Sequence, residues 1–300
     1  MTVPDDPDVA VPPASRVTVV TGRRFTARLF RWHAGARRPL LIREAATPWE
    51  VLVAEVMSQQ TGIERVGPAW RRFVDRWPTP ADLADAGTHD LLAAWAGLGY
   101  NRRALALREA ARTMVTDHAG SVPRTVTDLE RLPGIGPYTA RAVAATAFGR
   151  AVAPLDVNVR RVVSRVLGVA PASSGLQAAA DELVSRSDPG RWLDAVMDLA
   201  AGTCTTRAPR CATCPLAVVC ASGGVVVAVE PKSRAAPFPT TTRWLRGRLV
   251  AMATGVPAGT WVELPDHIGD HDSEAIAAAA RDLRREGFLE LRPGEARLRA

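Results

Sequence analysis

Four cysteines constrain this chain more than any other feature of its sequence. They are Cys204, Cys211, Cys214 and Cys220, separated by six, two and five residues. Four thiolates this close can enclose one compact centre, either a 4Fe-4S cluster or a structural zinc ion. Zinc sites commonly have two close pairs of cysteines, whereas here only Cys211 and Cys214 are close. The spacing therefore favours the cluster over zinc, and both over unliganded thiols.

The clustered cysteines also indicate a reducing compartment rather than a disulfide framework. No apolar run is long enough to cross a bilayer, and the acidic, proline-rich segment 1–14 is unlike a secretory signal. The formal charge of +7 and the pI near 10.1 point to a polyanionic partner. We expect a cytoplasmic, nucleoid-associated monomer that makes no membrane contact.

Helical signals dominate residues 21–202, where polar caps open apolar periodic runs and glycine or proline closes them. Examples are Thr79 followed by Asp82, Thr88 before Leu91, and Asn101 running to Gly120. The pattern predicts an all-α body of about ten helices without a strand. A chain of 300 residues that is 47% hydrophobic is long enough to bury a substantial core.

The composition of the chain changes after Cys220. Glycines and prolines predict a linker over residues 222–240, followed by a small α+β module. We expect helices at Thr242–Thr254 and Ser273–Glu286 and strands at Phe288–Leu291 and Ala296–Leu298, an order compatible with a winged helix. The predicted domains are a disordered tail over 1–20, a helical domain over 21–221 that includes the cysteine loop 204–220, the linker 222–240, and the module 241–300.

A glycine-rich turn lies between two of the predicted helices, in Leu132–Ala140. Gly134 and Gly136 flank Ile135, which permits a tight turn whose backbone amides point outward at the start of a helix. Such amides are suited to hold a phosphate group. Leucine and proline before the turn and an apolar helix after it favour a helix-hairpin-helix over an ordinary interhelical turn.

Two carboxylates stand out as candidates for chemistry. Asp156 starts a helix predicted to continue to Leu167, and an aspartate at that position is commonly only an N-cap. Glu55 lies among apolar residues of the segment Trp49–Gln60. A carboxyl at the border of an apolar face can have a raised pKa and donate a proton near neutral pH. On the local pattern alone, Glu55 can simply face water.

Taken together, these motifs resemble the MutY family of adenine glycosylases within the helix-hairpin-helix superfamily. The resemblance covers Thr47–Ala221, more than half of the chain, and follows the family's order. Its motifs are Pro48-Trp49 through Glu55 to Thr61, Gly97-Leu98-Gly99-Tyr100, the hairpin, Asp156 with Asn158, Met197-Asp198-Leu199, and the four cysteines.

The resemblance implies a two-lobed all-α fold with a 4Fe-4S cluster, which binds double-stranded DNA containing a mispaired adenine and flips that adenine into a pocket. Glu55 matches the family's general acid, which protonates the adenine ring. Asp156 matches the carboxylate that stabilises or captures the sugar cation before water attacks. Asn158 and Tyr138 match residues that line and orient the pocket.

The resemblance also implies a set of DNA contacts. Gln59 and Tyr100 match residues that wedge into the base stack, although Tyr100 read alone could be a plain buried aromatic. Gln60 adjoins this wedge, and Arg207 and Arg210 in the cysteine loop are candidates for phosphate contacts or simply solvated surface. The expected hairpin contacts are made by Gly134, Ile135, Gly136 and Thr139.

Tyr138 separates two branches of this superfamily. Members that also cut the strand resemble this hairpin but have a lysine where Tyr138 stands, because a Schiff base with the sugar needs an amine. All but one of the 38 lysines and arginines here are arginine, and the exception, Lys232, lies outside the helical body. The composition therefore predicts a monofunctional enzyme that hydrolyses the bond with water.

Three departures from the family pattern are evident. Val157 stands where the family usually has glycine, and Ser58 where it often has leucine. The segment after Cys220 is also too short for the family's nucleotide-hydrolase-like domain, which reads 8-oxoguanine. The predicted activity is removal of adenine mispaired with 8-oxoguanine or guanine. Two alternatives stay open: a T:G mismatch thymine glycosylase, and a non-catalytic iron-sulphur DNA-binding regulator.

Overall fold

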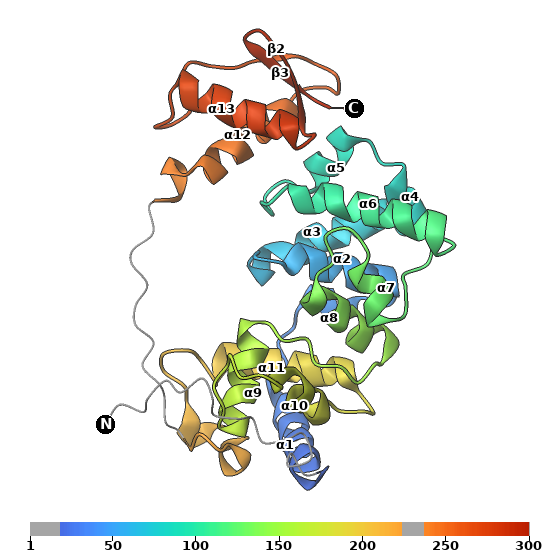
Figure 1. The fold of residues 1–300 in the computed structure, drawn as a ribbon, viewed down its shortest axis with the longest axis vertical. Coiled ribbons are helices and arrows are strands. Elements are labelled where there is room, and N and C mark those ends of the chain that lie inside the picture. The colour runs from blue at the N-terminus through green and yellow to red at the C-terminus, as the bar shows by residue number, and fades with distance from the viewer. Residues whose placement is uncertain (1–18, 224–236, 300) are drawn as a thin grey trace. The chain divides into compact units, whose positions relative to one another are not determined.

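The computed structural model describes residues 19–223 and 237–299 (Figure 1). The predicted tail up to residue 18 and residues 224–236 of the predicted linker lie outside the described residues. Within the described part, no helix is long and apolar enough to cross a membrane.

The prediction of a helical body is confirmed. Eleven α-helices occupy residues 19–202, where about ten were expected, and the described residues of this stretch form no strand. Their bounds are α1 (Val19–Ala36), α2 (Pro48–Ser58), α3 (Ile63–Arg76), α4 (Pro80–Ala84), α5 (Thr88–Ala94), α6 (Arg102–Asp117), α7 (Val126–Glu130), α8 (Pro137–Phe148), α9 (Val157–Leu167), α10 (Leu176–Leu183) and α11 (Pro189–Gly202). Short 3-10 helices lie between α1 and α2, at η2 (Leu41–Glu44), and after α11, at η3 (Cys211–Thr213), η4 (Ala217–Val219) and η5 (Phe238–Thr240).

Local capping explains where several helices begin. Thr79 is the predicted cap, and with Asp82 it forms a capping box, in which each side chain accepts a hydrogen bond from the other residue's backbone amide. Thr88 is not a cap: it is the first residue of α5, after Gly87, and its side chain is buried. Its hydroxyl instead accepts a hydrogen bond from Arg108. This bond satisfies the buried hydroxyl and stabilises the side chain inside the fold.

The described chain divides into two compact units, each made of discontinuous segments. Among the described residues, the first comprises 19–55, Pro123–Arg131 and 135–223, and the second comprises Val56–Val122, Leu132–Gly134 and 237–299. The predicted domain boundaries follow the chain without such interleaving, and they stay a prediction.

The first unit is organised around α11. This helix packs against α1, α8 and α9, and α1 also packs against α10 (Figure 1). Phe25 of α1 and Trp192 of α11 are both fully buried, with ring centroids 6.2 Å apart. Burial of such aromatic side chains removes large apolar areas from water and holds the helices in a fixed orientation.

The second unit has its own aromatic core. Phe73 of α3 packs edge-on against Trp95, with ring centroids 5.8 Å apart, and lies 4.7 Å from Trp77. Helices α4 and α5 pack on α6 around this core. The unit therefore has a packed interior that fixes the loops at the ends of α2, α5 and α6.

The C-terminal module agrees with its predicted order. It contains α12 (Thr242–Thr254), α13 (Ser273–Arg285), β2 (Leu289–Arg292) and β3 (Glu295–Leu298), within two residues of the expected bounds. Sequence reasoning missed a third strand, β1 (Val262–Glu263), which is only two residues long. The antiparallel sheet has the order β1-β3-β2, with Val262 opposite Ala296 and Leu289 opposite Leu298.

Candidate active site

Glu55 belongs to α2, in which Leu52, Val56 and Met57 are buried. Burial raises the pKa of Glu55 to about 7, and the negative charges of Asp194 and Asp156 raise it in the same direction. The side chain nevertheless keeps partial contact with solvent. The group can therefore hold a proton near neutral pH.

Asp156 is the N-cap of α9, as the local pattern predicts. Its Oδ1 accepts hydrogen bonds from the backbone amides of Asn158, at 2.8 Å, and Val159, at 2.7 Å. Its Oδ2 accepts a third from Asn158 Nδ2 at 2.8 Å. The cap does not argue against a chemical role, because the same bonds fix the carboxylate in one orientation.

Tyr138 is the second residue of α8 and lies within the same unit as both carboxylates. Burial raises the pKa of Tyr138 well above its ordinary value, and the charges of Glu55, Asp156 and Asp194 add to the rise. The phenol therefore stays neutral and keeps its proton. The charges of Glu55, Asp156 and Asp194 all act on the Tyr138 phenol, so these four groups form one electrostatic site.

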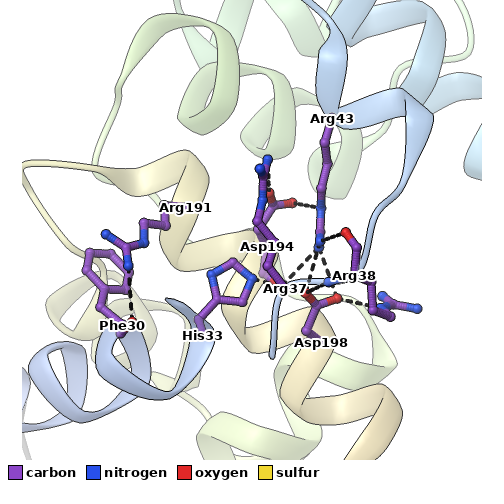
Figure 2. Close-up of polar contacts among 8 residues, drawn as sticks. All are labelled: Phe30, His33, Arg37, Arg38, Arg43, Arg191, Asp194 and Asp198. Carbon is purple, nitrogen blue, oxygen red and sulfur yellow. Dashed lines mark hydrogen bonds and ion pairs between the residues drawn. The ribbon is translucent and has the colours of Figure 1, made fainter. Parts of the chain in front are cut away.

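Asp194 and Asp198, on one face of α11, form a charged cluster that sequence reasoning did not assign to the site (Figure 2). Arg43 links them: its Nε is 2.9 Å from Asp194 Oδ1, and its Nη1 donates to Asp198 Oδ2 at 2.9 Å. Burial raises the pKa of Asp194, and Arg43 only partly offsets the rise. The negative charge of Asp194 in turn raises the pKa of Glu55.

Asp198 is the more deeply buried of the two, with 4% of its surface exposed. It also accepts hydrogen bonds from Arg38 Nε, at 2.5 Å, and its second oxygen lies 3.0 Å from His33 Nε2 (Figure 2). Burial alone would raise the pKa of Asp198, but bonds from Arg43 and Arg38 lower it to about 2. This carboxylate fastens the end of α1 and the turn η2 to α11.

One signal could have identified Asp194 in the sequence. It precedes Asp198 by four residues, which places both on the same side of α11, and Asp198 lies in a motif of the family. Arg43 offered no such signal, because its two partners lie more than 150 residues away along the chain.

The hairpin is formed as predicted, by α7, a turn and α8. Gly134 has φ +77°, and a Cβ atom there would lie 2.8 Å from the Cβ of Ala106, so only glycine fits. Ile135 and Thr139 are buried. Their side chains face the interior, which leaves the backbone amides at the start of α8 as the groups that can meet a phosphate.

The predicted wedge residues lie on two turns of the second unit. Gln60 is exposed with φ +53°, and Tyr100 is 39% exposed with φ +49°, so Tyr100 is not a plain buried aromatic. Gln59 Nε2 lies 3.5 Å from the carbonyl of Gly134 in the hairpin turn. The Tyr100 ring stacks on the Arg103 guanidinium, at 5.5 Å, and on that of Arg243, at 4.9 Å.

The four cysteine side chains line one cavity of about 280 Å³. Within the part of the chain that the structure covers, no three histidine, cysteine or acidic side chains are close enough to bind a single metal ion. Four thiols that line one cavity form the donor set that a 4Fe-4S cluster or a structural zinc ion requires. Arg207 and Arg210 are exposed, and Arg210 also lines the cavity.

Arg161 of α9 connects this loop to the carboxylates. Its Nε donates to the carbonyl of Cys204 at 2.9 Å, and its Nη1 donates to Asn158 Oδ1 at 3.0 Å. Since Asn158 in turn donates to Asp156, the cysteine loop contributes to the orientation of the Asp156 carboxylate. Arg165, one turn later, donates to Cys204 Sγ at 3.3 Å.

Residues 53–186 match the family model described as "HhH-GPD superfamily base excision DNA repair protein". The chain is 42% identical over 242 residues to an adenine DNA glycosylase of Mycobacterium tuberculosis, covering 77% of this chain and 79% of that protein. It is 38% identical to the human adenine DNA glycosylase, over 65% of this chain and 39% of that longer protein. The chain belongs to the adenine DNA glycosylase family.

Solved structures of other DNA glycosylases have a similar fold. A thermostable thymine-DNA glycosylase matches with a TM-score of 0.64 and 26% identity, over 69% of this chain and 98% of that one. An endonuclease III in a non-covalent DNA complex matches with a TM-score of 0.58 and 24% identity, over 69% of this chain and 96% of that one. The predicted helix-hairpin-helix glycosylase fold is thus confirmed, and the chain is a DNA glycosylase of base excision repair.

Proposed function

We propose that this enzyme binds double-stranded DNA as a monomer and hydrolyses the N-glycosidic bond of adenine mispaired with 8-oxoguanine or guanine. One observation carries the proposal: Glu55, with a pKa near 7, shares an electrostatic site with Asp156, whose orientation is fixed by three hydrogen bonds. An acid that can be protonated next to an oriented carboxylate is the arrangement that glycoside hydrolysis needs.

In this mechanism Glu55 gives its proton to the adenine ring, so that the base leaves without a negative charge. The sugar develops positive charge as the bond breaks, and the Asp156 carboxylate stabilises or captures it until water attacks. Asn158 holds Asp156 through its side-chain amide at 2.8 Å. The neutral phenol of Tyr138 lines the site and offers no amine for a Schiff base, which supports a monofunctional reaction.

We assign the DNA contacts to three groups of residues. Backbone amides of the hairpin, around Gly134, Ile135, Gly136 and Thr139, hold a phosphate of the DNA backbone. Gln59, Gln60 and Tyr100 enter the base stack and promote extrusion of the adenine. Arg207 and Arg210, both exposed, contact phosphates from the cysteine loop.

The cofactor that fits the cysteine loop is a 4Fe-4S cluster, held by Cys204, Cys211, Cys214 and Cys220. The four thiols line one cavity, which supports a cluster that they surround. When bound, the cluster would cross-link the loop and fix the position of its arginines. The residues of the loop take no part in bond breaking; Arg161 transmits the loop's position to Asn158.

A second candidate is removal of thymine from T:G mispairs, since a thymine-DNA glycosylase is among the similar structures. Single-turnover assays on A:8-oxoguanine, A:G and T:G duplexes separate the candidates. Release of adenine but not thymine supports the proposal. Release of thymine alone would replace it with the second candidate, and release of neither base, with retained DNA binding, would favour a non-catalytic DNA-binding regulator.

A further inference from the structure

Arg103, at the start of α6, is half-buried and contacts oxygen atoms from two separate turns. Its Nη1 donates to the carbonyls of Val56 and Met57, both at 2.9 Å, and of Gln59, at 2.5 Å. Its other terminal nitrogen, Nη2, donates to Thr61 Oγ1 at 2.9 Å, and to the carbonyls of Leu98, at 3.2 Å, and Gly99, at 2.9 Å. One guanidinium thus joins the turn after α2 to the turn before α6.

The charge of Arg103 has no carboxylate partner among these contacts, which are five carbonyls and one hydroxyl. Burial lowers the pKa of Arg103 to about 10, so the group stays charged at neutral pH. The carbonyls of Val56 and Met57 belong to the last turn of α2, where helix carbonyls lack partners within the helix and a cation is favoured. Arg103 therefore places a cation at the C-terminal end of α2 and adds donors to carbonyls of both turns.

Both turns contain a residue in a conformation that non-glycine residues rarely adopt. Gln60 has φ +53° in the first turn, and Tyr100 has φ +49° in the second. Such conformations persist only when surrounding contacts fix them, and they commonly occur where function requires a particular orientation. The Arg103 bonds to Gln59 and Gly99 lie directly beside these two residues.

We propose that Arg103 is a positioning residue that ties these two turns together and so sets the orientation in which Gln59, Gln60 and Tyr100 meet the base stack. This inference rests on the proposed function for the role of the turns in DNA, but not for the tie itself. Arg103 also stacks on the Tyr100 ring, 5.5 Å from its centroid, and this contact orients the exposed aromatic.

Arg108 provides a matched control on the same helix. It too is a half-buried arginine whose pKa is lowered by burial, and its Nη1 donates to the Ala86 carbonyl, at 2.9 Å, and to Thr88 Oγ1, at 3.1 Å. It holds a different loop, to which no DNA contact is assigned. Arg103→Lys and Arg108→Lys therefore make the same chemical change at two loops of different expected role.

The link that Arg103 makes between the two turns is tested by amide hydrogen exchange of the full chain without DNA. A lysine ammonium has three donors in a compact group and cannot reach six acceptors on two turns. Arg103→Lys should increase exchange at least about tenfold in both 56–62 and 96–102, whereas Arg108→Lys should leave both segments as in the parent. Parental exchange in both turns of a folded Arg103→Lys protein would overturn the proposal, whether or not the parent removes adenine.

The consequence for DNA is tested by the fluorescence of 2-aminopurine placed opposite 8-oxoguanine, which rises when the base leaves the stack. Arg103→Lys should reduce this rise by at least half, while Arg108→Lys should not. An unchanged rise would refute the role in base extrusion. The excision assay on the parent decides the proposed function separately.

Three milder substitutions cover the case in which Arg103→Lys fails to fold. Thr61→Val removes one acceptor of Arg103, and also the hydroxyl that donates to Leu98 O at 3.0 Å. It should increase exchange in both turns and reduce the 2-aminopurine signal, Thr61→Ser should restore both, and Thr88→Val should alter neither. Equal behaviour of Thr61→Val and the parent would contradict the proposal.

Discussion

The Asp194 carboxylate is, after burial, the largest cause that raises the pKa of Glu55. Asp194 remains an incomplete partner for Arg43, because burial raises its own pKa and Arg43 must serve Asp198 as well. Glu55 therefore keeps its proton up to a higher pH than a solvated glutamate does. The pair explains how an ordinary carboxyl can donate a proton at neutral pH.

Replacement of Glu55 by glutamine should lower single-turnover adenine excision by about a hundredfold or more, because glutamine cannot donate the proton to the base. In the parent, excision should be highest below pH 7 and fall about tenfold per pH unit above it, since only protonated Glu55 is active. A parent rate that rises through pH 7 to 8 would contradict this role.

The same substitution should have an opposite effect on stability. The pKa of Glu55 is higher in the folded protein than in the unfolded chain, so its stabilising contribution is present at pH 4 and is lost as pH rises toward 7. Glu55→Gln should therefore increase the free energy of unfolding at pH 8, by up to about 3 kcal/mol, and change it little at pH 4. Urea unfolding at both pH values measures the difference.

Replacement of Asp194 by asparagine should shift the pH dependence of excision. Removing the negative charge lowers the pKa of Glu55, so the midpoint of the pH profile should move to lower pH and activity at pH 7.5 should fall. Asp188→Asn, at the exposed N-cap of the same helix, is the control and should leave the midpoint in place. If both variants have the parental midpoint, Asp194 does not tune Glu55.

Local sequence signals were sufficient for the helices and for the hairpin. Gly134, with its positive φ and its close approach to Ala106, is a position where only glycine fits, and its neighbours mark the turn. The capping box at Thr79 and the N-cap at Asp156 also follow from residues within three positions. Such features are predictable because their partners are close in the chain.

Contacts between distant segments could not be predicted in this way. Arg43 reaches Asp198 across 155 residues, and Arg161 reaches Cys204 across 43, so no local spacing indicates either pair. Arginines are abundant in this chain, and the residues around an arginine do not show whether its side chain is exposed or buried. Thr88 was misassigned for the same reason, since Arg108 lies twenty residues away.

Asp156→Asn separates the two roles of that residue. Asparagine caps a helix about as well as aspartate, so stability should change by less than about 1 kcal/mol. Excision should nevertheless fall by about a thousandfold, because the neutral amide cannot stabilise the sugar cation. Asp188→Asn is again the matched cap variant and should retain parental activity. Full excision by a folded Asp156→Asn protein would reduce Asp156 to a cap.

Protein purified without oxygen should be brown and contain about four irons per chain, since four cysteines fit one cubane cluster. Cys211→Ser should lower the iron content, the solubility and the DNA affinity together. Iron analysis and visible absorbance measure the first, and an electrophoretic shift measures the last. Stoichiometric zinc without iron in the parent would contradict the assignment of the cavity to a cluster.

Tyr138→Lys should give the enzyme a covalent reaction that the parent lacks. The residue lies at the start of α8, and burial of this position would lower the pKa of a lysine there, against the opposing effect of the nearby carboxylates. A neutral amine would then be present in part of the molecules. Such an amine can attack C1′ of the sugar as the base leaves and form a Schiff base. Borohydride reduction would convert it to a stable protein-DNA adduct that migrates slowly in a denaturing gel.

The parent and Tyr138→Phe are the controls for this experiment, because neither side chain carries an amine. Both should release adenine without an adduct after reduction. A trapped adduct in the parent would show that another amine reaches the sugar, and the monofunctional assignment would then be wrong. If Tyr138→Lys folds and releases adenine but gives no adduct, position 138 does not face the sugar. The placement of Tyr138 in the substrate pocket would then be wrong.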